Sequence, residues 1–188
     1  MIYQSQSGDD DDGNGKFTAI NSTMEILSTS SVFSTAPMFF VTNIEATITL
    51  SNVTFNYGSR IFLDIKGTDE WGKSGRNGGN VTMIVSGQNI EGDILIDDYS
   101  SLTLILSSYS SFKGAINSAK SSGTIYIKID ASSNITLTGD SYIIDLDNDD
   151  YSGININTEG YSFKYSNSIY LTVGVLNFFF FVFNINVK

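Results

Sequence analysis

Apolar and polar side chains alternate along most of this 188-residue chain. From about Asn21 onwards the apolar spacing is two residues rather than 3.6, and short runs of Val, Ile, Leu, Thr and Phe end at Gly, Asn, Asp and Ser. A spacing of two places successive side chains on opposite faces of a β-strand. The pattern therefore predicts a chain that is nearly all strand, with no helix longer than ten residues.

Three consecutive segments share one arrangement, and their starts are separated by 21 and 23 residues. In each segment a five-residue strand is followed by a polar turn and by a second strand marked by Gly92, Gly114 or Gly139. Alternation along the first strands predicts three inward aliphatic side chains in each: Val81, Met83 and Val85; Leu102, Leu104 and Leu106; Ile125, Ile127 and Ile129.

The stretch ATITLSNVTF, which precedes these segments, follows the same alternation with one interruption. Ile48 and Leu50 are expected to point inward. A bulge or turn at residues 51–52 then shifts the alternation by one residue, so that Val53 and Phe55 also point inward.

A repeat of about 20 to 25 residues, with two or three short strands in each unit, predicts a parallel β-helix of about five to six coils. In such a solenoid each coil buries its apolar face only by stacking on its neighbours. An antiparallel β-sandwich is the alternative, because it also consists of short strands and turns. The sandwich requires tight hairpins such as Asn-Gly, which are scarce here.

The expected solenoid runs over residues 21–166, and a different composition is found on either side of it. Residues 1–20 contain the acidic run Asp9 to Asp12 and predict a disordered leader. Residues 167–188 contain SIYLTVGVLNFFFFVFNINV, which is uncharged and long enough to cross a bilayer. This tail is either a membrane segment, a terminal strand or cap, or an extension foreign to the domain.

Four stretches carry a resemblance to a known group of proteins. They are MFFVTNIEATITLSNVTFNYGS, WGKSGRNGGNVTM, NIEGDILIDDYSSLTLIL and NITLTGDSYI. They resemble the repeats of right-handed parallel β-helix surface proteins, namely adhesin-like and autotransporter-passenger-like proteins of the pectin-lyase-like fold group. The resemblance covers roughly Thr23 to Tyr165, and it implies a right-handed solenoid at the cell surface or outside the cell.

The composition is apolar enough for one folded unit, with 41% hydrophobic and 13% aromatic residues. The 20 acidic and 10 basic side chains give a net charge of -10, which repels phosphate groups, so nucleic acid is not an expected partner. The chain has no Cys and no His. Disulfides, zinc and iron-sulfur sites, thiol nucleophiles and imidazole catalysis are thereby excluded.

The stretch GTDEWGKS, residues 67–74, matches the phosphate-loop pattern G-x-x-x-x-G-K-[ST]. A working phosphate loop is followed at once by a helix, whose N-terminus binds the phosphates together with the N–H groups of the loop. Here Lys73 and Ser74 are followed by GRNGGN and then by the strand pattern VTMIV. Nucleotide binding is therefore not expected.

The same region, from Gly67 to Gly79, is the expected excursion from the solenoid and carries the only Trp. An exposed Trp71 could stack on a sugar ring while Asp69, Glu70 and Arg76 bind hydroxyl or carboxylate groups. The alternative is that the indole folds back and covers the edge of the coils.

Outward side chains of the stacked strands form a second candidate surface. Thr82, Thr103 and Tyr126 are expected in one column, and residues 84, 105 and 128 in the next. Such columns form a flat array suited to a polymer, so Tyr126 is a candidate contact. They also arise in any β-helix, because β-branched residues fit strands.

Acidic side chains in DLDNDD are weak candidates for a loose calcium site: Asp145, Asp147, Asp149 and Asp150. A twelve-residue calcium loop is excluded, because its sixth and twelfth positions hold Asp150 and Ile156 instead of Gly and Glu. A solvated turn is the alternative. Apart from calcium, no cofactor is expected.

Catalysis is not expected either. Asp93 and Asp140 both follow a marker glycine, but Ala115 occupies the matching place in the coil between them. Two rungs would separate the carboxylates by roughly 10 Å.

The sequence therefore favours a non-catalytic surface or secreted module for adhesion or polysaccharide binding. A fragment of a polysaccharide-active lyase or hydrolase and a purely structural spacer are the alternatives. No signal peptide pattern occurs at the N-terminus.

Overall fold

The computed structural model describes residues 2–5 and 14–169. These residues form strands, turns and bends, and no helix occurs among them. Within this part of the chain there is accordingly no helix of the length and apolarity needed to cross a bilayer. The prediction of a nearly all-strand chain is confirmed.

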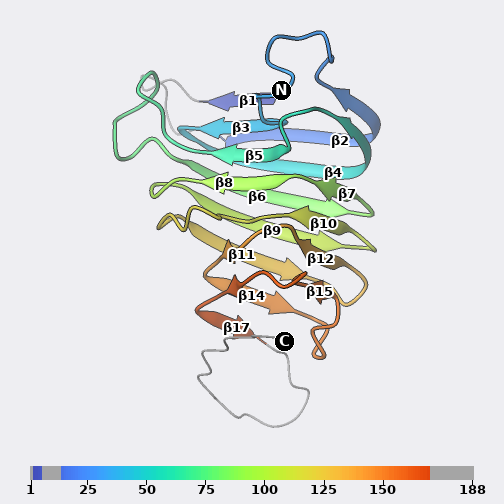
Figure 1. Ribbon diagram of the computed structural model, residues 1–188. Helices are drawn as coiled ribbons and strands as arrows, with labels where there is room; N and C mark the ends of the chain where they lie inside the picture. Colours follow the sequence, from blue (N-terminus) through green and yellow to red (C-terminus); the bar gives the residue numbers. More distant parts are fainter. Residues whose placement is uncertain (1, 6–13, 170–188) are drawn as a thin grey trace.

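The strands form three larger sheets and one two-stranded ribbon (Figure 1). The long sheet contains β2 (Asn14–Glu25), β4 (Ile44–Asn56), β6 (Gly79–Ser86), β9 (Ser101–Ser107), β11 (Thr124–Ile129), β14 (Asp145–Asn148) and β17 (Asn167–Ile169). The second sheet contains β1 (Ile2–Ser5), β3 (Phe39–Thr42), β5 (Ile61–Ile65) and β8 (Asp93–Ile96). The third sheet contains β7 (Asn89–Glu91), β10 (Ser111–Gly114), β12 (Asn134–Leu137) and β15 (Ile156–Asn157), and β13 (Ser141–Tyr142) pairs with β16 (Phe163–Lys164).

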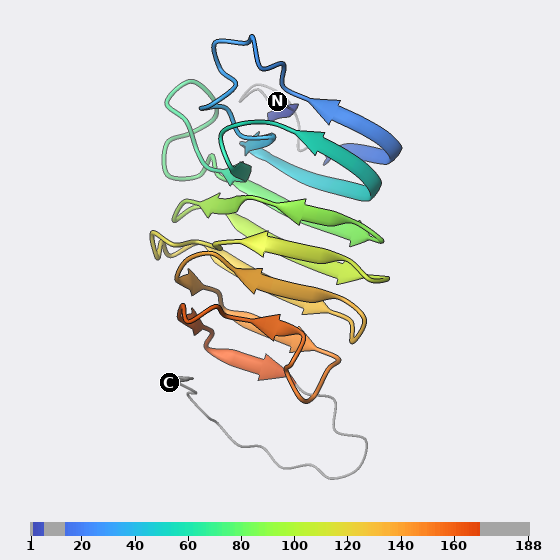
Figure 2. The same cartoon turned by 45° about the vertical axis from the view of Figure 1, so that its right-hand side comes forward.

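All strand pairs in the described residues are parallel. From β6 onwards, each strand of the long sheet up to β14 is followed by a strand of the third sheet before the chain returns to the long sheet. Successive passes of the chain therefore stack along one direction, as both ribbon views show (Figures 1 and 2). The antiparallel sandwich is wrong, because it needs antiparallel neighbours.

Aliphatic side chains fill the space between the sheets as the alternation predicted. The nine residues expected to point inward from β6, β9 and β11 are all buried, with at most 2% of their surface exposed. The strand registers also agree, since Val81 pairs with Leu102 and Leu102 pairs with Ile125. Each such buried side chain contributes about 1.5–3 kcal/mol, so these stacked layers hold the sheets together.

The predicted bend in ATITLSNVTF is also present. The pairing of β2 with β4 skips Asn21 and Asn52, whose φ angles are 49° and 51°. Asparagine tolerates this left-handed backbone better than most residues, and the Asn52 amide donates to Asn21 Oδ1 at 2.8 Å. Beyond the bend Val53 is buried and Phe55 is partly buried against the core.

Aromatic rings form the core below the second half of β4. Phe39, Phe55 and Phe62 pack edge to face, with ring centroids 5.2 to 6.2 Å apart. Phe17 of β2 adds a further edge contact to Phe39 at 5.6 Å. This geometry is favoured for aromatic pairs, and it packs the end of β4 against the core through Phe55.

The predicted boundaries need correction. Residues 2–5 and 14–20 were expected in a disordered leader, yet they belong to β1 and β2, and residues 14–20 pair with β4. Backbone pairing and the inward side chains Phe17 and Ala19 explain why this stretch joins the sheet. The run Asp9 to Asp12 lies outside the described residues. At the other end β17 extends the long sheet to Ile169, and residues 170–188 of the hydrophobic tail lie outside the described residues.

Candidate functional site

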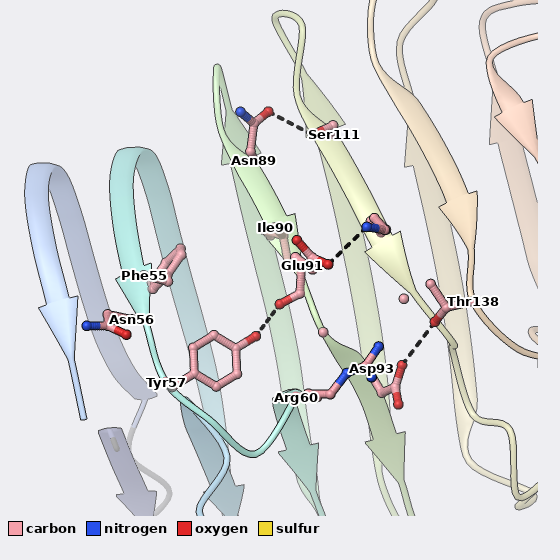
Figure 3. Close-up of a pocket in the computed structure, with 13 residues that line it drawn as sticks. Phe55, Asn56, Tyr57, Arg60, Asn89, Ile90, Glu91, Asp93, Ser111 and Thr138 are labelled. Atoms are coloured by element: carbon pink, nitrogen blue, oxygen red, sulfur yellow. Dashed lines mark hydrogen bonds and ion pairs between the residues drawn. The ribbon is translucent and has the colours of Figure 1, made fainter. Parts of the chain in front are cut away.

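A groove of about 520 Å³ lies beside the third sheet (Figure 3). It is lined by the end of β4, the connection from β4 to β5, strands β7 and β10, and Thr138 just after β12. Neighbouring strands in a sheet lie about 4.8 Å apart, so a groove that crosses these four levels extends roughly 14 Å along the stacking direction. This length suits a short stretch of a linear polymer.

The groove opens where strand pairing is interrupted. The first half of β4 pairs with β6 as far as Leu50 and Val85. Within the described residues, β4 beyond its bend pairs only with β2, and β7 pairs only with β10. We call the interruption between residues 53–57 and 88–93 the split.

Gln88 bridges one end of the split with its side-chain amide. Its Oε1 accepts a hydrogen bond from the N–H of Val53 at 2.6 Å, and its Nε2 donates to the carbonyl of Val53 at 2.8 Å. The same Nε2 donates to the carbonyl of Asn89 at 2.6 Å. Gln88 is buried, and its carboxamide replaces the peptide group that a paired strand would supply.

Tyr57 bridges the other end. Its hydroxyl donates to the carbonyl of Glu91, and its ring lies between the β4–β5 connection and β7 (Figure 3). Burial raises the pKa of Tyr57 well above its usual value, and the charges of Glu91 and Asp93 raise this pKa further. The phenol therefore stays protonated and donates across the physiological pH range.

Charged side chains of both signs line the groove. Lys113 Nζ lies 3.0 Å from Glu91 Oε1, and this pair is exposed. Asp93 Oδ1 accepts from the N–H of Ala115 at 2.8 Å and from the hydroxyl of Thr138 at 3.5 Å. Arg60 is exposed and belongs to none of the three ion pairs among the described residues. The groove therefore offers hydrogen-bond donors and acceptors without a strong net charge.

Two of the marker glycines allow the close approach of backbones at the groove floor. Gly92 has a φ of 140°, and a Cβ atom there would lie 2.3 Å from the Tyr57 hydroxyl. A Cβ atom on Gly114 would lie 2.2 Å from the carbonyl oxygen of Gly92. A side chain at Gly114 would push adjacent passes apart, and one at Gly92 would displace the Tyr57 hydroxyl in a backbone conformation that favours glycine, so both glycines are structural requirements of the groove.

The candidate residues of the Gly67–Gly79 region lie elsewhere, in the β5–β6 loop (residues 66–78) that projects from the stack (Figures 1 and 2). Asp69, Glu70 and Arg76 are exposed, and Trp71 is 38% exposed. The structure thus brings these four residues into one loop. Arg60 precedes β5 and the loop follows it, so the groove and the loop lie at opposite ends of this strand.

Buried Asn77 fixes the loop backbone. Its amide donates to the carbonyls of Thr68 and Trp71, at 2.7 Å for Trp71. Its own carbonyl accepts from the N–H of Asn43 at 2.9 Å. After Ser74 the chain continues in turns and then enters β6, so the helix that a phosphate loop needs is missing between β5 and β6.

Tyr126 lies apart from both regions, on the outer face of the long sheet. It pairs with Thr103 of β9 and Asp145 of β14 and is 41% exposed. The predicted column Thr82–Thr103–Tyr126 is confirmed by these registers. Residues 84, 105 and 128 also form the predicted second column.

The calcium candidates are spread over one strand and a turn. Asp147 pairs with Lys128 at 2.9 Å, which also raises the pKa of Lys128. Asp150 accepts hydrogen bonds from Ser152, which lower the pKa of Asp150. Asp145 and Asp149 complete the four candidates. In the described part of the chain no three acidic side chains are arranged to hold a metal ion.

Asp93 and Asp140 are not paired with each other. Asp93 binds the backbone of Ala115, and Asp140 accepts from the N–H of Ser162 at 2.9 Å. Each carboxylate thus caps a backbone N–H 22 residues further along. The repeated glycine–aspartate feature is explained by this stacking contact.

Sequence reasoning missed the groove. Tyr57, Gln88 and Lys113 are ordinary residues in the sequence, and only the marker glycines and Asp93 drew attention to this region. A comparison of the second half of β4 with the later strands could have shown that its inward alternation has no matching partner strand. Comparisons with family models, with curated proteins and with solved structures found no match to this chain.

Proposed function

We propose that this protein is a non-catalytic surface or secreted module that binds polysaccharide through the groove. The observation that carries the proposal is a polar groove that crosses successive strands along the stacking direction. A linear glycan presents hydroxyl groups at regular intervals, and each needs a hydrogen-bond partner when it leaves water. Asn89, Ser111 and Lys113 supply such partners along one wall.

The scaffold of this module is, in our proposal, a right-handed parallel β-helix of the adhesin-like or autotransporter-passenger-like kind. Parallel sheets and their repeated order support it, as does the strong preference for right-handed crossovers between parallel strands. Five strands of the long sheet, β4, β6, β9, β11 and β14, lie wholly within residues 21–166. This number supports the expected five to six coils.

A binding role is favoured over catalysis because the groove carboxylates are already engaged. Glu91 pairs with Lys113, and Asp93 binds the backbone of Ala115. A glycoside hydrolase needs one carboxyl group that can give up a proton and a second one that acts as base or nucleophile. The lyase or hydrolase fragment and the structural spacer are the competing functions.

A polysaccharide pull-down with three proteins tests the proposal. Ser111→Trp places a large ring in the groove from an outward position of β10, whereas Trp71→Ala removes the exposed ring of the β5–β6 loop. We expect the wild type and Trp71→Ala to bind and Ser111→Trp to lose binding. Release of shorter chains would show an enzyme, and the absence of binding to every polysaccharide would leave the spacer.

A further inference from the structure

The split leaves peptide groups of β4 pointing into the groove. Along β4 the N–H and carbonyl of Val53 face Gln88, and the carbonyl of Asn56 faces β2, where it accepts from Ile26. Peptide groups of alternate residues point to opposite sides of a strand. The N–H and carbonyl of Phe55 therefore face the split, and they have no hydrogen-bond partner among the described residues.

The opposite lip of the split is the edge of β7. The carbonyl of Gln88 and the N–H of Gly92 bind β10, so Asn89 and Glu91 present their peptide groups to the split. Their carbonyls accept from Gln88 and Tyr57. Their N–H groups have no partner in the described part of the chain.

The two bridges limit what can enter. Gln88 spans the split at Val53, and the side chain of Tyr57, just after the end of β4, spans it four residues further along the chain. Only Phe55 lies between them with both peptide groups facing the split. One amide group can pair there, whereas an extended peptide strand would need to displace both bridges.

We propose that the polysaccharide is N-acetylated and that one acetamido group completes the missing rung between β4 and β7. In a trans secondary amide the N–H and the carbonyl point in opposite directions. The acetamido N–H can therefore donate to the carbonyl of Phe55 while its carbonyl accepts from the N–H of Glu91. This inference rests on the proposed function and adds the chemical class of the sugar, an N-acetylhexosamine.

Gln88 forms a related amide bridge within the same split, in which the nitrogen donates to both lips and the oxygen accepts from Val53. Its carboxamide binds the peptide groups of Val53 on one lip and Asn89 on the other. Unpaired strand edges are general templates for added amide groups. A sugar with a hydroxyl in place of the acetamido group presents a single oxygen atom and lacks an N–H donor and a carbonyl acceptor that point in opposite directions.

Calorimetry with two trisaccharides tests the inference. Chitotriose and cellotriose have the same β-1,4 backbone, but only chitotriose carries acetamido groups. We expect chitotriose to bind at least about tenfold more tightly, since two hydrogen bonds are at stake. Equal affinities overturn the inference. Binding only of glycans that lack N-acetyl groups also overturns it and leaves the proposed function standing, whereas failure to bind any glycan removes both.

A pair of variants isolates the peptide N–H of residue 91. Glu91→Pro removes this N–H, while Glu91→Ala removes the same carboxylate and keeps the N–H. We expect the tenfold preference for chitotriose to disappear in Glu91→Pro and to persist in Glu91→Ala. Retention of the preference in a folded Glu91→Pro protein would contradict the inference. Tighter binding of an N-acetylated hexapeptide than of chitotriose would show strand addition and overturn it as well.

Discussion

The groove and the β5–β6 loop lie at opposite ends of β5 and hold their side chains in different ways. In the groove, buried Gln88 and partly buried Tyr57 join two strands that lack a backbone ladder. In the loop, buried Asn77 fixes the backbone while the charged side chains extend into solvent. A rigid site holds its ligand contacts in place before binding, so the groove is the better preorganised of the two regions.

Replacement of buried Gln88 in the groove and buried Asn77 in the loop should show the largest difference between the two regions. Gln88→Ala leaves the peptide groups of Val53 buried without partners, and we expect a loss of about 3 kcal/mol in the free energy of unfolding. Asn77→Ala should change the free energy of global unfolding much less. It should instead speed up amide hydrogen exchange within residues 67–78. Urea unfolding together with amide exchange checks both, and equal global losses would contradict the comparison.

Glycine substitutions test how closely the backbones approach. Gly114→Ala brings a Cβ atom to 2.2 Å from a backbone oxygen, and we expect a loss of about 2 kcal/mol from the displacement of adjacent passes. The matched loop variant is Gly75→Asn, where the φ of 79° suits asparagine and the nearest atom to a new Cβ is 4.0 Å away. Its unfolding free energy should stay within about 0.5 kcal/mol of the wild type. A larger loss in the loop variant would show that the loop is the tighter region.

The hydroxyl of Tyr57 should have a smaller and pH-dependent effect. Tyr57→Phe removes one hydrogen bond and should cost about 1 kcal/mol at neutral pH. Because the folded state raises the pKa of Tyr57, it disfavours loss of the phenolic proton. The contribution of Tyr57 is therefore complete below the ordinary tyrosine pKa of about 10 and declines as the pH rises above it.

Unfolding free energies at pH 8 and pH 11 measure this decline. The difference between the wild type and Tyr57→Phe should shrink at the higher pH. Tyr99→Phe is the control, since Tyr99 is 61% exposed beside the β5–β6 loop and its hydroxyl makes no hydrogen bond in the described residues. A pH-independent difference for Tyr57 would contradict the assigned hydrogen bond.

Calcium should have the smallest effect. Asp147 is paired with Lys128, and Asp150 is engaged by Ser152. We expect no measurable change in Tm when EDTA or millimolar calcium is added, and no change in glycan affinity. A calcium-dependent rise in Tm that is lost in Asp147→Asn would contradict this expectation and indicate a metal site in the DLDNDD segment.

Alternation of side chains was sufficient to predict the stacked layers. Val81, Leu102 and Ile125 pair as expected because a period of two fixes which face is buried. The bend at Asn52 was equally visible, since one extra residue shifts the alternation. Local patterns such as these predict which face of a strand is buried and which residues it pairs with in the next repeat.

The groove could not be predicted in the same way, because it depends on a pairing that is missing. Val53 and Gln88 lie 35 residues apart, and nothing in either residue type indicates that a side-chain amide replaces a backbone rung. The inclusion of residues 14–20 in β2 was missed for a related reason. Their acidic, glycine-rich neighbours suggested disorder, whereas pairing with β4 decides their structure.

The most direct test is an NMR spectrum of the protein saturated with a glycan that it retains in the pull-down. The chain has one Trp, so a single indole N–H signal reports on the loop, while the amides of Phe55, Asn89 and Glu91 report on the groove. The groove model predicts that these three amide signals move and that the Trp71 indole signal stays in place. Movement of the indole signal with unchanged groove amides would contradict it and return the binding site to the loop.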